Sequence, residues 1–148
     1  MPTADPGAIA AALAPFRTAL LATRGEDGHL RCRPMAMRHA LRGEEIWFAT
    51  SPESGKCRDL EYEPRCALVF FDAATGTTVS VSGSGEVIRD RKLTASLWDR
   101  SWDRWFPDGP EPSAVALLRV IPELVERHDG ASGRVEVLFQ AARRKAGR

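Results

Sequence analysis

Polar and apolar residues alternate over short stretches along most of the chain, as they do in half-buried β-strands. The stretches are separated by turn residues such as Asp27-Gly28, and they cover residues 18–23, 30–38, 45–50, 66–71, 77–88, 114–121 and 123–127. The fourth, CALVFF, is apolar throughout and predicts a strand buried on both faces. Short strands at this spacing favour a mainly β protein, a six- to seven-stranded antiparallel barrel with short helices, over a parallel sheet.

Two segments carry the start and stop signals of short helices. The first is rich in alanine and runs from Pro6 to Pro15, because proline is tolerated in a first turn and limits the far end. The second runs from about Ser54 to Glu63 and stops before Pro64, whose ring disfavours helical geometry in the residue before it. The first helix precedes the first predicted strand, and the second lies between two predicted strands.

A third helix is predicted over residues 91–106, with Asp90 as its N-cap. Within it Trp98, Trp102 and Trp105 recur at spacings of four and three residues, which places them on one helical face. We expect this face to be buried, with Trp98 and Trp102 in core or dimer packing.

Two of the predicted strands contain residues that interrupt regular pairing. Pro34 has no N–H to donate, so strand 30–38 is expected at a sheet edge or with an irregularity, where a ligand can reach backbone atoms. Gly83 and Gly85 permit a bulge or a sharp bend in strand 77–88.

The composition is that of a globular protein with a real core. The chain has 148 residues, 28% of them charged, and a formal net charge of +1, which argues against a nucleic-acid-binding surface. We predict a single domain over residues 1–148, with a basic tail at about 143–148 that is solvated. No apolar stretch is long enough to span a bilayer and the first residues do not resemble a signal peptide, so we expect a cytoplasmic protein.

Cysteine and histidine do not form a pattern that predicts a metal site or a disulfide framework. Cys32, Cys57 and Cys66 are odd in number and include no C-x-x-C pair, so we expect reduced, partly buried thiols. The three histidines stand apart from one another and from carboxylates at ligand spacing, which predicts no metal site.

Residues 31–56 contain the outline of a phosphate site. They end in Ser51, Ser54 and Lys56 where a helix is expected to begin, either with Ser51 as cap or nearer Ser54. A helix start carries unpaired N–H groups and partial positive charge, and Arg33 lies two residues after Arg31 on one strand face. From spacing alone, an ordinary hairpin followed by a capped helix with solvated basic residues remains the simpler interpretation.

Four segments in this order resemble the pyridoxamine 5'-phosphate oxidase-like flavoproteins, and most closely their general stress protein branch. They are RPMAM at 33–37, IWFATSPESGK at 46–56, VSVSG at 79–83 and WFPDGP at 105–110. The resemblance covers most of residues 18–129. It implies a split β-barrel that binds FMN at a homodimer interface.

The resemblance also implies which residues bind the cofactor. Arg33 and Lys56 would hold the phosphate, with Thr50 and Ser51 beside it. The ring would lie along one strand and its neighbours, with Trp105 closing over it from the other subunit and Thr78 as a further polar contact. The implied wall residues are Pro34, Met35, Ala36 and Ala49.

One departure limits the activity that the resemblance implies. Pyridoxamine phosphate oxidases bind their substrate with a C-terminal arginine, any residue, histidine pattern, and the corresponding place here reads Arg134-Val135-Glu136. We therefore expect a flavin-dependent oxidoreductase with another small substrate. The alternatives are a flavin-binding stress protein without turnover, and a split barrel that binds a deazaflavin or haem.

Overall fold

The computed structural model describes residues 6–35 and 40–141. These residues form three α-helices, one short 3-10 helix and eight β-strands. In chain order the elements are α1 (Pro6–Leu13), β1 (Ala19–Arg24), β2 (Leu30–Met35), β3 (Ala40–Arg42), β4 (Glu45–Thr50), α2 (Gly55–Tyr62), β5 (Arg65–Phe71), β6 (Thr78–Ile88), α3 (Arg91–Leu97), η1 (Arg100–Trp102), β7 (Ala116–His128) and β8 (Val135–Gln140).

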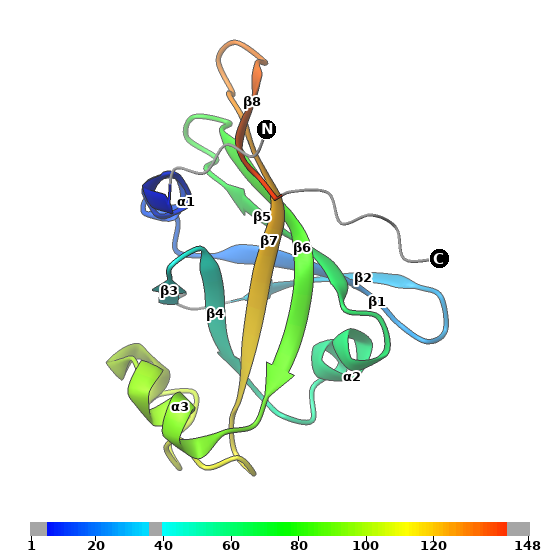
Figure 1. The fold of residues 1–148 in the computed structure, drawn as a ribbon, viewed down its shortest axis with the longest axis vertical. Helices are drawn as coiled ribbons and strands as arrows, with labels where there is room; N and C mark the ends of the chain where they lie inside the picture. Colours follow the sequence, from blue (N-terminus) through cyan, green and yellow to red (C-terminus); the bar gives the residue numbers. More distant parts are fainter. Residues whose placement is uncertain (1–5, 36–39, 142–148) are drawn as a thin grey trace.

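All the strands pair in one antiparallel sheet, as the alternating pattern predicted. Its order is β2-β1-β5-β6-β7-β4-β3, and β8 pairs with β7 off this path. The long strands β6 and β7 run through the middle, and the hairpin of β7 and β8 projects from one end (Figure 1). Strands β3 and β8 were not predicted, because three residues are too few to show a pattern and VEVLFQ was not recognised as a strand.

The two strands predicted around Pro122 are one continuous strand, β7. The pairing with β6 shifts between Ser82 and Gly83, where Ser82 pairs with Leu124 and Gly83 with Pro122, so Glu123 is an extra residue. This bulge lets the strand pass a residue that cannot donate to the ladder. A Cβ on Gly83 would lie 2.1 Å from the carbonyl oxygen of Ile121, which explains why glycine stands there.

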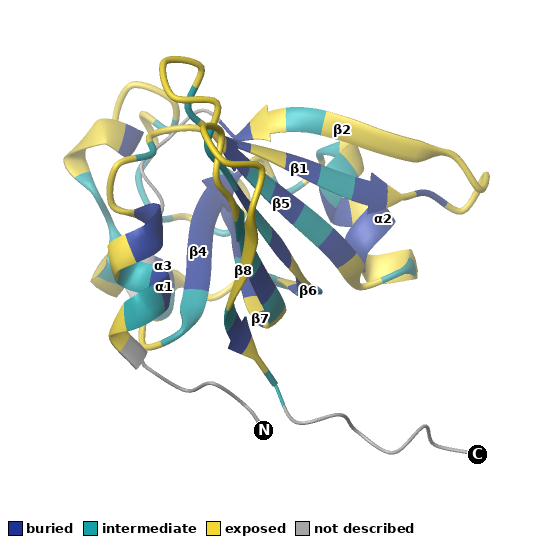
Figure 2. Cartoon of the chain, turned by 90° about the horizontal axis from the view of Figure 1, so that it is seen from above, coloured by how far each residue is buried: buried dark blue, intermediate teal, exposed yellow. Residues whose placement is uncertain are grey.

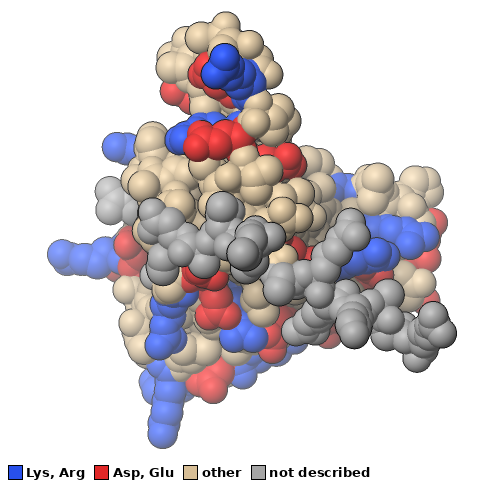
Figure 3. Space-filling model, turned by 45° about the horizontal axis from the view of Figure 1, so that its top comes forward, with Lys and Arg blue, Asp and Glu red and all other residues tan. Residues whose placement is uncertain are grey.

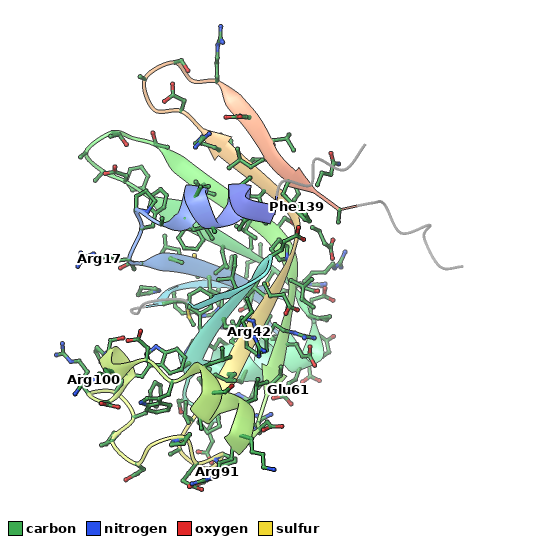
Figure 4. The ribbon with its side chains drawn as sticks, turned by 60° about the vertical axis from the view of Figure 1, so that its left-hand side comes forward. Arg17, Arg42, Glu61, Arg91, Arg100 and Phe139 are labelled. Carbon is green, nitrogen blue, oxygen red and sulfur yellow. The ribbon has the colours of Figure 1, made fainter. Side chains whose placement is uncertain are left out.

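The main core lies on the concave side of the sheet. It contains inward side chains of most strands together with Ile9 and Leu13 of α1, and Phe139 of β8 packs in the same cluster (Figure 4). Strand β4 shows mainly buried residues, whereas much of β2 is exposed (Figure 2). Strand β5 is not buried on both faces as predicted, since its residues alternate between buried and more accessible positions and Phe71 is 57% exposed.

The predicted helix over 91–106 is wrong beyond its first two turns. Asp90 does cap α3, with its Oδ1 accepting from the N–H of Leu93 at 3.0 Å, but the helix ends at Leu97. Asp99 then accepts from the N–H of Ser101 at 2.8 Å and starts the 3-10 turn η1. A residue that caps a new turn competes with continuation of the helix, so the tryptophans do not share one helical face.

A second core forms where this segment folds back onto β4 and β7. Trp102 is fully buried there, and its ring lies 5.5 Å from that of Trp98 in an edge-to-face arrangement. The cluster also holds Trp47, Ala49, Val115 and Leu117. Trp98 and Trp102 therefore serve core packing, one of the two roles expected for them.

Charges of both signs are interspersed on the face seen in Figure 3. No helix in the described ranges, 6–35 and 40–141, is long and apolar enough to cross a membrane. The three cysteines are free thiols, with Cys57 and Cys66 buried and Cys32 exposed. The basic tail predicted at 143–148 lies outside the described residues.

Candidate functional site

A cavity of about 360 Å³ lies between the ends of β2 and β4, the start of α2 and the segment after η1. It gathers residues that are up to about seventy positions apart in the sequence. Seven of its lining residues are candidates from the sequence: Pro34, Met35, Ala49, Thr50, Ser51, Lys56 and Trp105. Its volume lies in the range of small-molecule sites, which is about 300–1,000 Å³.

One end of the cavity carries a positive charge and hydroxyl groups. The ammonium of Lys56 donates to Thr50 Oγ1 at 2.9 Å, and the Thr50 side chain is itself buried. Burial lowers the pKa of Lys56 below its ordinary value, the neighbouring Cys57 opposes this shift, and the positive charge of Arg33 adds to it. A lysine that is partly desolvated and close to another cation is a site that an anion would stabilise.

The helix start beside Lys56 is fixed by a thiol rather than by a serine cap. Ser54 is the N-cap residue of α2, but its side chain makes no cap hydrogen bond. Its hydroxyl donates to Cys57 Sγ at 3.3 Å, and that thiol donates to the carbonyl oxygen of Ser51 at 3.5 Å. The helix therefore begins after Ser54, the second of the two sequence alternatives.

The walls of the cavity are mainly apolar. Pro34 and Met35 come from β2, Ala49 from β4, and Trp105 and Phe106 from the segment after η1. Trp105 is 54% exposed, and the guanidinium of Arg104 lies 5.2 Å from its ring centre. The sequence led us to expect Trp105 from a second subunit, whereas here it borders the cavity of its own chain.

Arg33 does not line the cavity, contrary to the geometry expected of a phosphate ligand. Its Nη1 donates to Thr23 Oγ1 at 2.6 Å and to the Leu21 carbonyl oxygen at 3.3 Å, and its Nη2 lies 3.4 Å from Asp59 Oδ2. The guanidinium is thus tied to β1 and α2. Its charge still acts on Lys56, as the lowered pKa of that lysine records.

Thr78 is not among the lining residues of this cavity, and Ala36 lies outside the described residues. Thr78 begins β6, where it pairs with Phe71 and His128. Thr78 therefore lies on the outer face of the sheet and does not line the cavity of its own chain.

Sequence reasoning missed three residues of this region. Phe106 lines the cavity, but only its neighbour Trp105 was singled out. Thr23 and Asp59 are buried polar residues joined by a hydrogen bond of 2.8 Å between Thr23 Oγ1 and Asp59 Oδ2. The spacing of Asp59 three residues after Lys56 places both on one side of α2, and this was the available signal.

The arrangement suits a ligand with an anionic group and a flat apolar body. The cationic end provides Lys56, two hydroxyl side chains and a helix start, which together favour a phosphate. The other walls present aromatic and aliphatic surface, against which a planar ring packs favourably.

Solved structures share this fold. One is a Clostridium acetobutylicum protein related to general stress protein 26 of Bacillus subtilis, at a TM-score of 0.78 and 18% identity, covering 92% of this chain and 96% of that one. A pyridoxamine 5'-phosphate oxidase-related, FMN-binding protein of Nostoc punctiforme gives 0.66 and 16%, covering 89% and 84%. These likenesses confirm the predicted split β-barrel.

Other solved structures of the same fold belong to proteins described with cofactors other than FMN. An F420 reductase gives a TM-score of 0.57 at 25% identity and covers 74% of this chain and 88% of its own. A haem-binding protein of Mycobacterium smegmatis gives 0.66 at 16%, covering 90% of this chain and 56% of that chain. The fold alone therefore does not select one cofactor.

Two curated relatives match by sequence. Protein bli-3 of Neurospora crassa is 32% identical over 111 residues, which are 68% of this chain and 53% of that protein. General stress protein 26 of Bacillus subtilis is 26% identical over 84 residues, 55% of this chain and 59% of the relative. The chain thus spans less than two thirds of either relative. The family model described as pyridoxamine 5'-phosphate oxidase like matches residues 7–148, and the chain belongs to that family.

Proposed function

We propose that the protein binds FMN in this cavity and uses it to transfer hydride or electrons to or from a small substrate. The single observation that carries the proposal is the cavity itself, with a cationic, hydroxyl-lined end and an apolar, aromatic body. FMN has the matching two-part chemistry, a phosphate joined to a flat and largely apolar ring. The FMN-binding relative from Nostoc punctiforme supports the same assignment.

The phosphate end of FMN would lie at Lys56. The ammonium would contribute a charge-assisted hydrogen bond, and Thr50 and Ser51 would add hydroxyl contacts beside the first turn of α2. Arg33 would add positive charge from behind the wall of the cavity. Because the phosphate would relieve the repulsion between the two cations, binding would favour the charged form of Lys56.

The ring of FMN would lie against the β2 wall. Pro34, Met35 and Ala36 would follow one side of it, with Ala49 at its border and Trp105 at the open side. Pro34 cannot donate a hydrogen bond and β2 is an edge strand, so polar backbone atoms near it are accessible to a ligand. The flavin supplies the redox chemistry, while these residues bind it, orient it and exclude water.

We further propose that two copies of the chain assemble on the outer face of the sheet. The pairing registers place Leu20, Phe71, Val135 and Val137 on this face, and their side chains are 41%, 57%, 52% and 44% exposed. Pro34 pairs with Leu20, so the face is continuous with the wall of the cavity. The exposed apolar residues of β1 and β5 are separated from those of β8 by Thr78 and His128, and exposed apolar groups rimmed by polar residues are typical of an interaction surface.

Dimerisation would also give Thr78 a role. It lies on the same outer face, between Phe71 and His128, and away from the cavity of its own chain. A second copy seated on this face would bring Thr78 toward the partner's cofactor. Trp105 would then border its own cavity while the partner covers the opening.

Two alternatives follow from the comparisons. The general stress protein 26 relative is consistent with a protein that binds flavin without turnover. The F420 reductase and the haem-binding structure are consistent with a deazaflavin or haem in place of FMN. Among the described residues that line the cavity there is no histidine or cysteine, the usual ligands of haem iron.

The proposal is tested by titrating the purified protein with FMN and following the quenching of flavin fluorescence. The wild type should bind one FMN per chain. Lys56→Ala should weaken binding by about tenfold or more, as expected for loss of a charged hydrogen bond of about 1.5–3 kcal/mol. Arg33→Ala should also weaken binding by about tenfold, because it removes the positive charge behind the cavity wall. Lys92→Ala is the matched control, since Lys92 is exposed on α3 and should leave the affinity unchanged.

Unchanged affinity in both the Lys56 and the Arg33 variant would refute this placement of the phosphate. Turnover is tested separately by reducing the complex with NAD(P)H and following reoxidation by oxygen or a quinone. A flavin that is bound but that none of these reagents changes would favour the non-catalytic alternative. Titration with deazaflavin and with haem under the same conditions compares the remaining cofactors.

A further inference from the structure

A buried polar cluster lies immediately behind the cationic end of the cavity. It joins Thr23 of β1, Arg33 of β2 and Asp59 of α2, and the side chains of Arg33 and Asp59 are 21% and 11% exposed. Thr23 Oγ1 donates to Asp59 Oδ2 at 2.8 Å and accepts from Arg33 Nη1 at 2.6 Å. The cluster therefore connects three elements at the place where the cavity carries its charge.

The carboxylate of Asp59 is not expected near a site that favours an anion. Asp59 follows Lys56 by three residues on α2, and Lys56 lines the end of the cavity that favours an anion. A buried negative charge there would repel a phosphate at short range, because interactions between charges are strong where water is excluded. Asp59 must therefore also favour phosphate binding in some way that offsets that repulsion.

The contacts of the Arg33 guanidinium show how Asp59 can favour phosphate binding. Two hydrogen bonds use Nη1 of Arg33 and one polar contact uses Nη2, so the guanidinium is fixed by Leu21, Thr23 and Asp59 together. Its remaining donors, among the five N–H groups that arginine carries, stay available. Held in this way, the cation lies close enough to Lys56 to affect that group, whereas a free arginine side chain on an edge strand would extend into solvent.

We propose that Asp59 is a positioning residue for the phosphate of the cofactor, and that it acts by holding Arg33 against the cationic end of the cavity with Thr23 as the bridge. The inference rests on the proposed FMN site and adds to it. Asp59 does not line the cavity and does not touch the ligand itself. It sets where the positive charge of Arg33 lies.

A positioning role and a purely electrostatic role of Asp59 predict opposite effects of its substitution on FMN affinity. If Asp59 positions Arg33, Asp59→Asn releases the guanidinium and weakens FMN binding. If Asp59 is only a nearby negative charge, the same substitution removes repulsion and tightens FMN binding. Asparagine has the shape of aspartate and keeps an acceptor for Thr23, so the change tests the charge.

The experiment measures dissociation constants of FMN and riboflavin for the wild type, Asp59→Asn, Arg33→Ala and the double variant. Asp59→Asn should weaken FMN by about tenfold, because the positive charge of Arg33 moves away from the phosphate, and should leave riboflavin unchanged because riboflavin has no phosphate. The double variant should bind FMN no more weakly than Arg33→Ala alone, because Asp59 acts through Arg33.

Asp129→Asn is the matched control. Asp129 is an exposed carboxylate in the turn between β7 and β8 that accepts from the N–H of Ser132 at 3.1 Å, so its loss removes a charge of the same type outside the cluster and should not change FMN affinity. Thr23→Val is the second variant, since it removes the bridging hydroxyl with little change of shape and should also weaken FMN selectively. It keeps the test decisive where Asp59→Asn does not fold.

Three results would overturn the inference. They are FMN binding by Asp59→Asn as tight as or tighter than that of the wild type, equal weakening of FMN and riboflavin, and additive losses in the double variant. A wild-type protein that binds neither flavin refutes the proposed function instead, so the two failures are distinguishable.

Discussion

Lys56 shows how the surroundings of one side chain prepare it for a ligand. Its ammonium is partly buried, donates to Thr50 at 2.9 Å and lies within the field of Arg33, and the resulting pKa is below the ordinary 10.5. Burial and a neighbouring cation both make the charged form less stable in the free protein. A bound phosphate would stabilise the charged form and so oppose both effects. Phosphate binding and protonation of Lys56 are therefore coupled.

This coupling predicts a pH dependence of FMN affinity. Affinity should be constant while Lys56 is charged and should fall as pH rises through the pKa of the free protein, which lies below 10.5. The measurement is the FMN dissociation constant from neutral to alkaline pH. Lys92→Ala should keep the fall and Lys56→Ala should abolish it, whereas the same profile in the wild type and in Lys56→Ala would contradict the coupling.

At the scale of elements, the segment after α3 is folded by its own polar residues. Asp99 caps η1, and Trp98 Nε1 donates to Asp103 Oδ1 at 2.7 Å. These two contacts turn the chain between Trp98 and Trp102. Trp102 is consequently fully buried, while Trp105 reaches the edge of the cavity and is 54% exposed. Two tryptophans three residues apart thus have different environments.

The two tryptophans should respond differently to truncation. Trp102→Ala removes a fully buried ring and should lower the free energy of unfolding by about 3–5 kcal/mol. Trp105→Ala should change it little but should weaken FMN, because it removes a wall of the cavity. Urea unfolding and FMN titration measure the two effects. A Trp105→Ala protein that unfolds as easily as Trp102→Ala would show that Trp105 serves packing alone.

At the scale of the whole molecule, the outer sheet face carries exposed apolar residues that one chain leaves uncovered. They lie on β1, β5 and β8, with β6 and β7 between β5 and β8, and the face begins at the cavity wall. A second copy would bury it and enclose the cofactor at the same time. Assembly and cofactor affinity should therefore change together.

Light scattering should give a mass of two chains for the wild type. Phe71→Glu places a charge in the middle of the outer face, where Phe71 is 57% exposed, and should yield monomers with weaker FMN binding. Tyr62→Glu is the matched control, because Tyr62 is also 57% exposed but lies on α2. A wild type that is monomeric at all concentrations, or a dimer that Phe71→Glu leaves intact, would contradict this interface.

Local sequence patterns predicted most of the elements correctly. Alternation marked β2 and β6, and short segments bounded by turn signals marked β1 and β4. Proline and serine signals bounded α2, and Asp90 marked the start of α3. These features depend on interactions within a few residues, which a sequence displays directly. The glycine signal at Gly83 also predicted the irregularity that the pairing of β6 and β7 shows.

The amino-acid sequence by itself therefore determined the strand-rich fold, because period and turn chemistry are local, whereas most of the residues around the cavity were predicted from the resemblance of its segments to a known family. Only the tertiary structure decided that Arg33 is bound to Asp59 and Thr23, that Thr78 lies on the outer face, and that Trp105 borders its own chain's cavity. Those relations join residues from separate strands and helices. Their partners are set by how the sheet curves and which elements pack together, and no short stretch of sequence carries that information.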